Sequence, residues 1–368
     1  MSALRRTWSV CWRLVLCIAL LGWILNSIFS NDGRAEAQRL GLKWDDLARI
    51  EQWRLAWTHG PQELWRTICL VHPWTLAVSL GLTFLTVLLG VARWRMVLEV
   101  QGLHLPWKRA LNISFVAQFF NSFLLGATGG DLIKAYYAAR ETHHKKTEAV
   151  VTVFVDRLIG LWALLLFATV MMAPNFQIFR ERQGLLYPAL LILVMLGGTT
   201  VVLGLAFWGG VSKRFPRARH YLRRIPKGEY LERSLDSCRR FGAEKGFLLK
   251  VVVLSVALNT VWVMQVTTLA AGLDLPISPL PLFAIVPTVF CISALPITPS
   301  GLGVRENLFV IMLATLGVAR KSALSLSLLS YAASLFWSLF GGVVYAGLRD
   351  KEHLSEVRQE TVAEAGKA

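Results

Sequence analysis

Two short elements that combine glycine or proline with charged residues interrupt long apolar stretches of this sequence. The first runs from Asn121 through Gly129-Gly130-Asp131 to Lys134, and the second is Pro299 followed by Gly301-Leu302-Gly303-Val304-Arg305-Glu306. Such residues break a helix and leave backbone N–H groups without partners. Free N–H groups at the start of a half-helix, together with an arginine, suit a phosphate or a carboxylate. For the first element alone, an ordinary helix end is the alternative, because glycine is a good stop and aspartate a good N-cap.

An adjacent pair of charges, Asp156-Arg157, lies early in the apolar stretch 150–172. Intramembrane charges are costly and usually face a polar cavity, which makes both residues candidates for a binding site. Adjacent residues on a helix do not face each other, so the two charges need separate partners. We expect Arg157 and Arg305 to contact an anionic group, with Asp131, Asp156 and Glu306 positioning these cations or relaying protons. Arg157 could instead extend to the membrane surface, about 10 Å away.

The composition indicates that these residues lie in a membrane protein. Of the 368 residues, 55% are hydrophobic and only 17% are charged, whereas a soluble chain carries about 25% charged residues. Residues 74–92, 185–211, 251–273 and 322–348, among others, contain no Asp, Glu, Lys or Arg. Each is about as long as the roughly 20 residues that a helix needs to cross a bilayer core. The sequence therefore predicts an all-α bundle with six spans, at about 12–30, 74–92, 150–172, 185–209, 250–272 and 322–348.

The basic residues decide how the two broken stretches, 110–130 and 275–316, are threaded. Residues 212–250 carry twelve Lys and Arg. If both stretches crossed the membrane as conventional helices, this loop would be external, against the tendency of basic loops to stay in the cytoplasm. If each enters and leaves on one side, the loop and both termini are cytoplasmic. The parity then places the two hairpins, 110–130 and 281–304, on opposite sides as an inverted repeat.

This threading divides the chain into four parts. Residues 1–30 form an anchor span, 31–73 an external segment, 74–348 the main transmembrane domain with its cytoplasmic loop 212–249, and 349–368 a cytoplasmic tail. The external segment contains Trp44, Trp53, Trp57 and Trp65 at helical spacing. It is either a helix lying in the outer interface or a small cap packed on the ends of the spans. The expected location is the cytoplasmic (inner) membrane.

Several other classes of function find little support. The formal net charge is +16, but the basic residues lie between apolar spans, where they set topology, so we expect no nucleic-acid partner. The five cysteines show no metal-ligand spacing, and no Walker A pattern occurs, so we expect no metal, no cofactor and no ATPase. Asn259 and Gln265, inside one span, are expected to form interhelical hydrogen bonds.

These residues also carry a resemblance to a known family. The run from Asn121 through Gly129-Gly130-Asp131 and Lys134, the later Asp156-Arg157, and the segment Pro296 to Glu306 resemble the lysylphosphatidylglycerol synthase transmembrane (flippase-like) family. The resemblance covers about residues 70–348. It implies a bundle with re-entrant helices that moves aminoacylated or other anionic lipids between leaflets. Lys134, where arginine is expected, and Thr128 and Ser300 depart from the family pattern.

The resemblance and the charges together give three hypotheses for function. The first is a lipid translocase, not an enzyme, for an anionic, aminoacylated or polyprenyl-phosphate-linked lipid. No aminoacyl-transferase domain is expected, because the chain ends about twenty residues after its last predicted span. The second is a partner subunit that docks a membrane synthase or glycosyltransferase without transporting. The third is a membrane-embedded transferase, which would need paired carboxylates around a metal or a general base. Association of the chain with itself also stays open.

Overall fold

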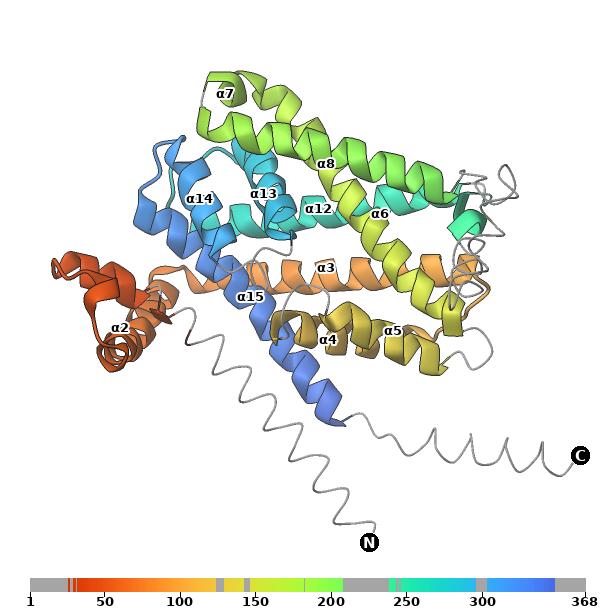
Figure 1. The fold of residues 1–368 in the computed structure, drawn as a ribbon, viewed down its shortest axis with the longest axis horizontal. Coiled ribbons are helices and arrows are strands. Elements are labelled where there is room, and N and C mark those ends of the chain that lie inside the picture. Colours follow the sequence, from red (N-terminus) through yellow and green to blue (C-terminus); the bar gives the residue numbers. More distant parts are fainter. Residues whose placement is uncertain are drawn as a thin grey trace, which may run out of the picture.

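A computed structural model describes residues 26, 29–30, 32–123, 129–141, 146–181, 183–207, 238–242, 244, 246–295 and 303–347, and these form helices and connecting turns (Figure 1). Among the described residues, five helices are long and apolar enough to cross a membrane. They are α3 (Pro73–Val100), α6 (Lys146–Met172), α8 (Gln183–Phe207), α12 (Phe247–Gly272) and α15 (Arg320–Gly347). Five of the six predicted spans are thereby confirmed, and the first, 12–30, lies almost wholly outside the described residues.

Two pairs of shorter helices occupy the broken stretches. The first pair is α4 (Trp107–Phe123) and α5 (Gly129–Glu141), and the second is α13 (Pro279–Ser293) and α14 (Val304–Ala314). The pairs lie toward opposite ends of the bundle, α4 and α5 near the start of α6, and α13 and α14 near α7 (Phe176–Glu181) (Figure 1). Residues 124–128 and 296–302, at the two breaks, lie outside the described part of the chain.

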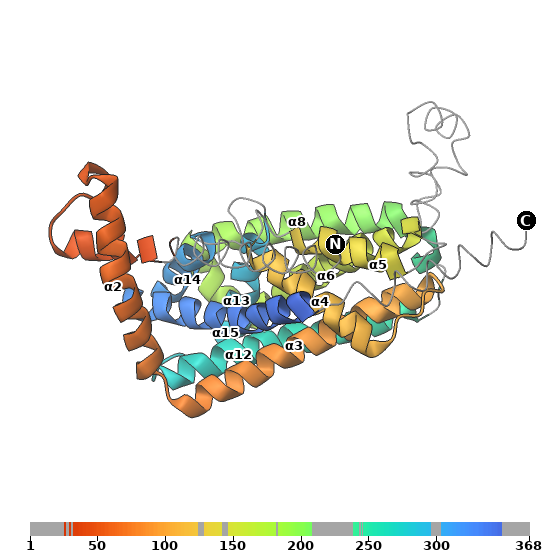
Figure 2. The same cartoon turned by 90° about the horizontal axis from the view of Figure 1, so that it is seen from below.

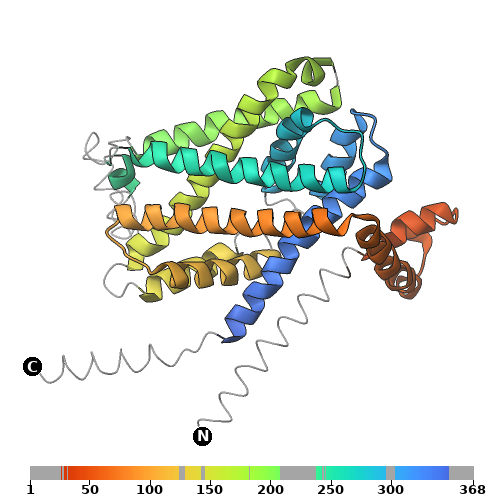
Figure 3. The same cartoon turned by 180° about the vertical axis from the view of Figure 1, so that it is seen from behind.

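The two halves of the bundle repeat one pattern of helix contacts. In the first half α4 packs on α15 and α5 packs on α6, while in the second half α13 packs on α6 and α14 packs on α15. Among the described helices, α3 and α12 form the most extensive contact and run side by side, as Figure 3 shows from behind. Matching the series α3 to α6 with the series α12 to α15 therefore reproduces the contacts of the bundle. The helices α7 and α8 lie outside this pattern, with α8 packed against α6.

Two boundaries differ from the sequence prediction. The composition predicts that the first broken stretch ends at residue 130, but α5 continues it to Glu141. This helix buries Ala135, Tyr137 and Ala138 and exposes Leu132 and Tyr136, so hydropathy read along the sequence does not reveal its buried face. Likewise α3 continues beyond the predicted end at residue 92 to Val100, which places Arg93 inside the helix rather than in a loop.

The segment 31–73 is largely helical. After the short 3-10 helix η1 (Trp44–Asp46), α2 (Arg49–Leu70) crosses one end of the bundle at a steep angle to α3 (Figure 2). Trp57 donates a hydrogen bond to Asn26 at 2.8 Å and packs edge-on against Phe29, whereas Trp53 and Trp65 are exposed. The segment thus combines side chains packed on the preceding residues with exposed indoles. A second 3-10 helix, η2 (Ala173–Asn175), links the end of α6 to α7.

Candidate functional site

A cavity of about 510 Å³ lies among the repeated helices, and each of α3 to α6 and α12 to α15 contributes at least one lining residue. Six of the candidate binding residues predicted from the sequence line it: Asn121, Asp131, Lys134, Asp156, Arg157 and Arg305. Glu306 is buried and bonds to Arg305, and Gly129 and Gly130 are buried at the start of α5. Pro299 and Gly301 lie outside the described residues. The structure therefore brings charges from both halves of the chain to one cavity.

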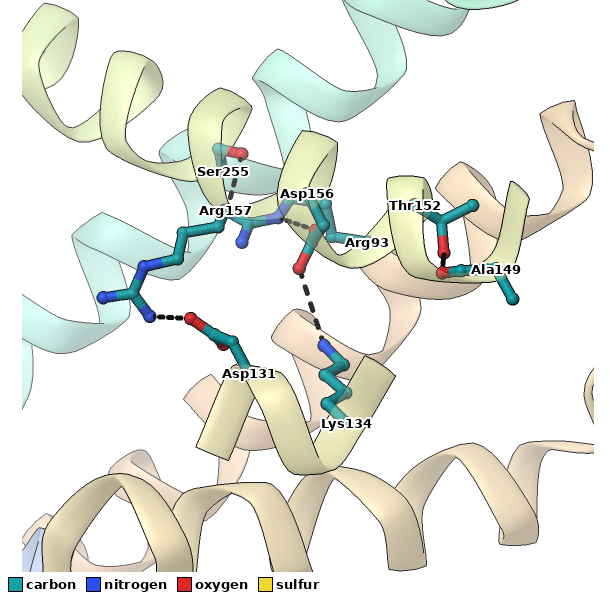
Figure 4. Close-up of polar contacts among 8 residues, drawn as sticks. All are labelled: Arg93, Asp131, Lys134, Ala149, Thr152, Asp156, Arg157 and Ser255. Carbon is teal, nitrogen blue, oxygen red and sulfur yellow. Dashed lines mark hydrogen bonds and ion pairs between the residues drawn. The ribbon is translucent and has the colours of Figure 1, made fainter. Parts of the chain in front are cut away.

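Asp156 holds two cations that come from different helices (Figure 4). Arg93 on α3 donates from Nε to Asp156 Oδ1 at 2.8 Å, and Lys134 Nζ on α5 lies 3.6 Å from Oδ2. The Lys134 ammonium also lies 4.1 Å from the centroid of the Trp94 ring, where a cation is attracted by the ring face. The exposed fractions of the three charged side chains are 13% or less. One carboxylate thus compensates two buried cations.

Arg157, the neighbour of Asp156, points to a different partner. Its guanidinium donates to a carboxylate oxygen of Asp131, the third residue of α5 (Figure 4). Asp156 and Arg157 therefore have separate partners, as expected for adjacent residues of a helix. The Arg157 side chain is 37% exposed, which makes it the most accessible of the paired cations that line the cavity. It pairs inside the bundle, so the alternative that it extends away to the membrane surface is not what the structure shows.

The first break depends on a close approach of two backbones at Gly130. Its N–H donates to Asn121 Oδ1 at 2.9 Å. A Cβ placed on Gly130 would lie 1.9 Å from the carbonyl oxygen of Ala117, a clash that only glycine avoids. The pairing of α4 with α5 at the cavity therefore requires a residue without a side chain at this position.

The second break places another ion pair beside the cavity. Arg305 bonds to Glu306, and Arg305 Cζ lies 4.4 Å from the centroid of the Tyr331 ring. Glu306 Oε2 also accepts a hydrogen bond from the N–H of Gly303 at 2.5 Å, which caps α14. The sequence predicts a close backbone approach at Gly303 as well as at Gly130. The described residues do not provide one, since none of their atoms lies within 4 Å of the place that a Cβ would take there. The requirement for glycine comes instead from a φ of +85°.

Sequence reasoning missed one cation of the charged cluster, Arg93, and the glycine that makes room for it, Gly160. Arg93 directly follows a run without charges, and the composition places it in a cytoplasmic loop, yet the fold brings it to a carboxylate 63 residues later in the chain. Gly160 makes room for it, because a Cβ at Gly160 would lie 2.7 Å from Arg93 Nη2. A glycine one helical turn after the Asp156-Arg157 pair was the available signal.

Gln265 and Ser330 line the same cavity and are also buried. Gln265 Nε2 donates to Ser79 Oγ at 2.8 Å, and Ser330 Oγ donates to Gln265 Oε1 at 3.2 Å. The expectation that Gln265 forms interhelical hydrogen bonds is confirmed, because Ser79 lies on α3 and Ser330 on α15. Asn259 is buried as well, but its expected interhelical bond stays a prediction.

The chemistry available in the cavity is that of charge recognition. Arginine can hold two oxygens of a phosphate or carboxylate at once, and lysine supplies a compact point charge. Within the described residues no group of three or more His, Cys, Asp or Glu could hold a metal ion. An anionic group fits the donors that line the cavity.

Comparison with known proteins places the chain among membrane proteins. Residues 52–342 match the family model described as the lysylphosphatidylglycerol synthase TM region. The chain is also similar to a UPF0104 membrane protein of Methanothermobacter thermautotrophicus, with 24% identity over 300 residues that cover 74% of this chain and 83% of the relative. The family match extends over more than half of the chain and includes every residue that lines the cavity. The protein is therefore a multi-pass membrane protein that belongs to the lysylphosphatidylglycerol synthase transmembrane family.

Proposed function

We propose that this protein moves a lipid with an anionic head group between the leaflets of the cytoplasmic membrane, without hydrolysing ATP. The observation that carries the proposal is the convergence of Arg93, Lys134, Arg157 and Arg305 on one cavity inside a bundle of apolar helices. Isolated charges in the hydrocarbon region would cost several kcal/mol each, so such a cluster is retained for a polar ligand or pathway.

The arrangement of the short helices supports transport in particular. Both pairs, α4 with α5 and α13 with α14, consist of helices too short for a crossing of about 20 residues. We take them as re-entrant hairpins that enter from opposite sides, related by a two-fold axis in the membrane plane. Binding between two inverted repeats is the arrangement that lets a transporter open its site to either side in turn. A transferase or a non-transporting partner subunit has no need of this symmetry.

Transport is tested by reconstituting the purified protein in liposomes that contain a fluorescent anionic lipid and quenching the outer leaflet selectively. The wild type should accelerate exchange between leaflets over empty liposomes. Arg305→Ala should lower the rate about tenfold or more, because the head group loses a cationic partner, and Arg305→Lys should restore only part of it, because lysine lacks the planar guanidinium.

Arg95→Ala is the matched control, since Arg95 pairs with Glu99 on the same helix and does not line the cavity. Its rate should equal that of the wild type. A wild-type rate equal to that of empty liposomes, for every lipid tried, would reject the transport proposal. The rival proposals would then be tested directly, by co-purification of a synthase or glycosyltransferase for the partner subunit and by head-group transfer for the enzyme.

The proposed topology places both termini and the basic loop in the cytoplasm, and α2 outside. The supporting observation is that α2 and α7 lie toward one end of the bundle, while the C-terminal end of α3 lies at the other (Figure 1). The thiol of Cys69 in α2 is exposed. In a protein that keeps only this cysteine, an impermeant maleimide should label intact cells.

The control is Lys108→Cys in a cysteine-free background, at an exposed position just after the start of α4. It should be labelled only after the membrane is permeabilised. Labelling of Lys108→Cys in intact cells would contradict the proposed orientation.

A further inference from the structure

The helix α2 carries a band of exposed apolar side chains. Ile50, Trp53 and Trp65 are 80%, 58% and 68% exposed, and Pro61 between them is exposed as well. At 3.6 residues per turn, these four side chains fall within about 120° of the circumference of the helix. Single apolar side chains on a surface are normal, whereas a continuous apolar band marks a surface that contacts a membrane or another protein.

A different side of the same helix is polar. Glu51, Gln62 and Arg66 are exposed, and they fall within about 60° of one another, centred about 130° away from Ile50. Cys69, whose thiol is exposed, lies on this side too. The part of α2 that does not contact the protein is therefore amphipathic, with one apolar side and one polar side.

The packing of α2 on the preceding residues fixes how the helix is rotated about its own axis. Ala56 and Gly60 are buried, and a Cβ placed on Gly60 would lie 2.6 Å from the side chain of Phe29. Trp57 also packs on Phe29, and the rings of Trp53 and Trp57 have their centroids 5.8 Å apart. The apolar band therefore begins at the edge of a packed aromatic cluster and continues onto the exposed side.

The path of the chain keeps α2 near the level at which α3 begins. Val71 and His72 separate the two helices, and the three peptide units between the helix ends reach at most about 11 Å. With its 22 residues, α2 is about 33 Å long, but it crosses the end of the bundle at a steep angle to α3 (Figure 2). The helix thus runs across the direction of the spans and not outward from their end.

Exposed aromatic side chains at the starts of other helices mark the same level. Trp74 lies at the start of α3, Phe176 at the start of α7 and Tyr187 near the start of α8, and all three are exposed. Tryptophan and tyrosine are enriched where spans pass through the membrane–water interface. Because α2 and α7 lie toward the same end of the bundle (Figure 1), the indoles of α2 lie where such an aromatic belt is expected.

A basic residue within the apolar band fits a lipid surface. Arg54 is exposed and lies about 40° from Ile50 around the helix. A long arginine side chain can lay its aliphatic part along an apolar surface and place its charge at the phosphate groups of lipids. Indoles and an arginine side by side match the boundary between acyl chains and head groups.

We propose that α2 is an interfacial helix that binds the membrane surface, with Ile50, Trp53 and Trp65 inserted among the lipids, Arg54 at their phosphates, and Gln62 in water. In the proposed topology this surface belongs to the outer leaflet. The inference rests on that topology only for the choice of leaflet, and it does not depend on transport.

The bound helix also acts on the two central spans. The N–H of His72, in the turn between α2 and α3, donates to the carbonyl oxygen of Gly272 at the end of α12 at 3.4 Å. Binding of α2 to the surface therefore fixes the depth of α3 and α12 together.

The test places a fluorescent probe on either side of α2 in the full-length protein, after the native cysteines are replaced. Ile50→Cys and Gln62→Cys, both at exposed positions, are labelled with NBD and reconstituted in lipid nanodiscs. A nitroxide on the acyl chains, about 5–10 Å below the head groups, should quench the probe at position 50 and spare the probe at position 62. Iodide in the water should quench the probe at position 62 and spare the other.

The informative variant combines Trp53→Ser with Trp65→Ser, which removes two exposed indoles of the band and keeps the packed Trp57. Nitroxide quenching of the probe at position 50 should fall toward the value of the probe at position 62, because the helix loses much of its apolar contact with the lipids. The control is Trp107→Ser, which removes an exposed indole at the start of α4, and it should leave the quenching unchanged.

Equal quenching of both probes by iodide, without quenching by the nitroxide, would overturn the inference and favour a protein partner for the band. Unchanged nitroxide quenching in the double tryptophan variant would overturn it as well, since the bundle alone would then hold α2 at the surface. Either failure would leave the transport proposal in place, because the measurement does not involve lipid exchange.

Discussion

Replacing Asp156 with asparagine is expected to destabilise the protein by about 3–5 kcal/mol and to abolish the proposed lipid transport. The substitution keeps the shape of the side chain but removes the carboxylate that pairs with both Arg93 and Lys134. Removing one partner of a buried ion pair leaves an uncompensated charge, which costs far more than the pair contributed. The measurements are thermal unfolding of the purified protein and lipid exchange in liposomes.

Two comparisons with other variants isolate the cause of this destabilisation. Adding Lys134→Met to Asp156→Asn restores the charge balance of the cluster and should recover part of the stability, though not the transport. Glu99→Gln removes the partner of Arg95 in an exposed pair at 3.7 Å and should change stability by less than about 1 kcal/mol. An Asp156→Asn protein as stable as the wild type would show that the two cations are compensated by something other than this carboxylate.

The second large effect is expected at Gly130, where alanine should strongly reduce both the yield of folded protein and transport. The added Cβ would lie 1.9 Å from the Ala117 carbonyl oxygen and 2.6 Å from Asn121 Cγ. Because one of these contacts is with backbone, α4 and α5 must move apart, at a cost of about 1–3 kcal/mol or more. That movement also breaks the Gly130–Asn121 hydrogen bond and shifts Asp131 away from Arg157.

Gly197→Ala and Gly198→Ala are the controls, because a Cβ at either position of α8 meets no described atom within 4 Å. They should fold and transport like the wild type. Folded yield and unfolding temperature are read from fluorescence-detected size exclusion after heating. Gly130→Ala with wild-type yield and transport would mean that α4 and α5 tolerate a wider separation than the structure has.

The sequence was sufficient for features that depend on long-range composition. The long apolar runs located α3, α6, α8, α12 and α15, because a membrane span needs a continuous apolar stretch and little else. The helix-breaking elements located both pairs of short helices. The charges next to those breaks, Asp131 and Arg305, do line one cavity.

Features that depend on the packing of one helix against another could not be predicted from the sequence. Arg93 escapes prediction because the absence of charge delimits the spans, and that criterion ends a span at the first arginine even where the helix continues. The extent of α5 escapes it because the buried face of this helix is made of small and aromatic residues between charged ones. The role of Gly160 can be seen only when the guanidinium of Arg93 is placed next to it.

The repeated helix contacts also bear on the energetics of an alternating cycle. If each half adopts the arrangement of its counterpart, the bundle keeps an equivalent set of helix contacts and opens toward the opposite face. Most of the packing free energy then cancels between the two conformations. The remaining free-energy difference comes from positions where the halves differ. One example is the ion pair of Arg93 and Asp156 between α3 and α6, where α12 and α15 have the hydrogen bond of Gln265 and Ser330. Substitutions at these few positions would therefore determine toward which leaflet the empty protein opens at rest.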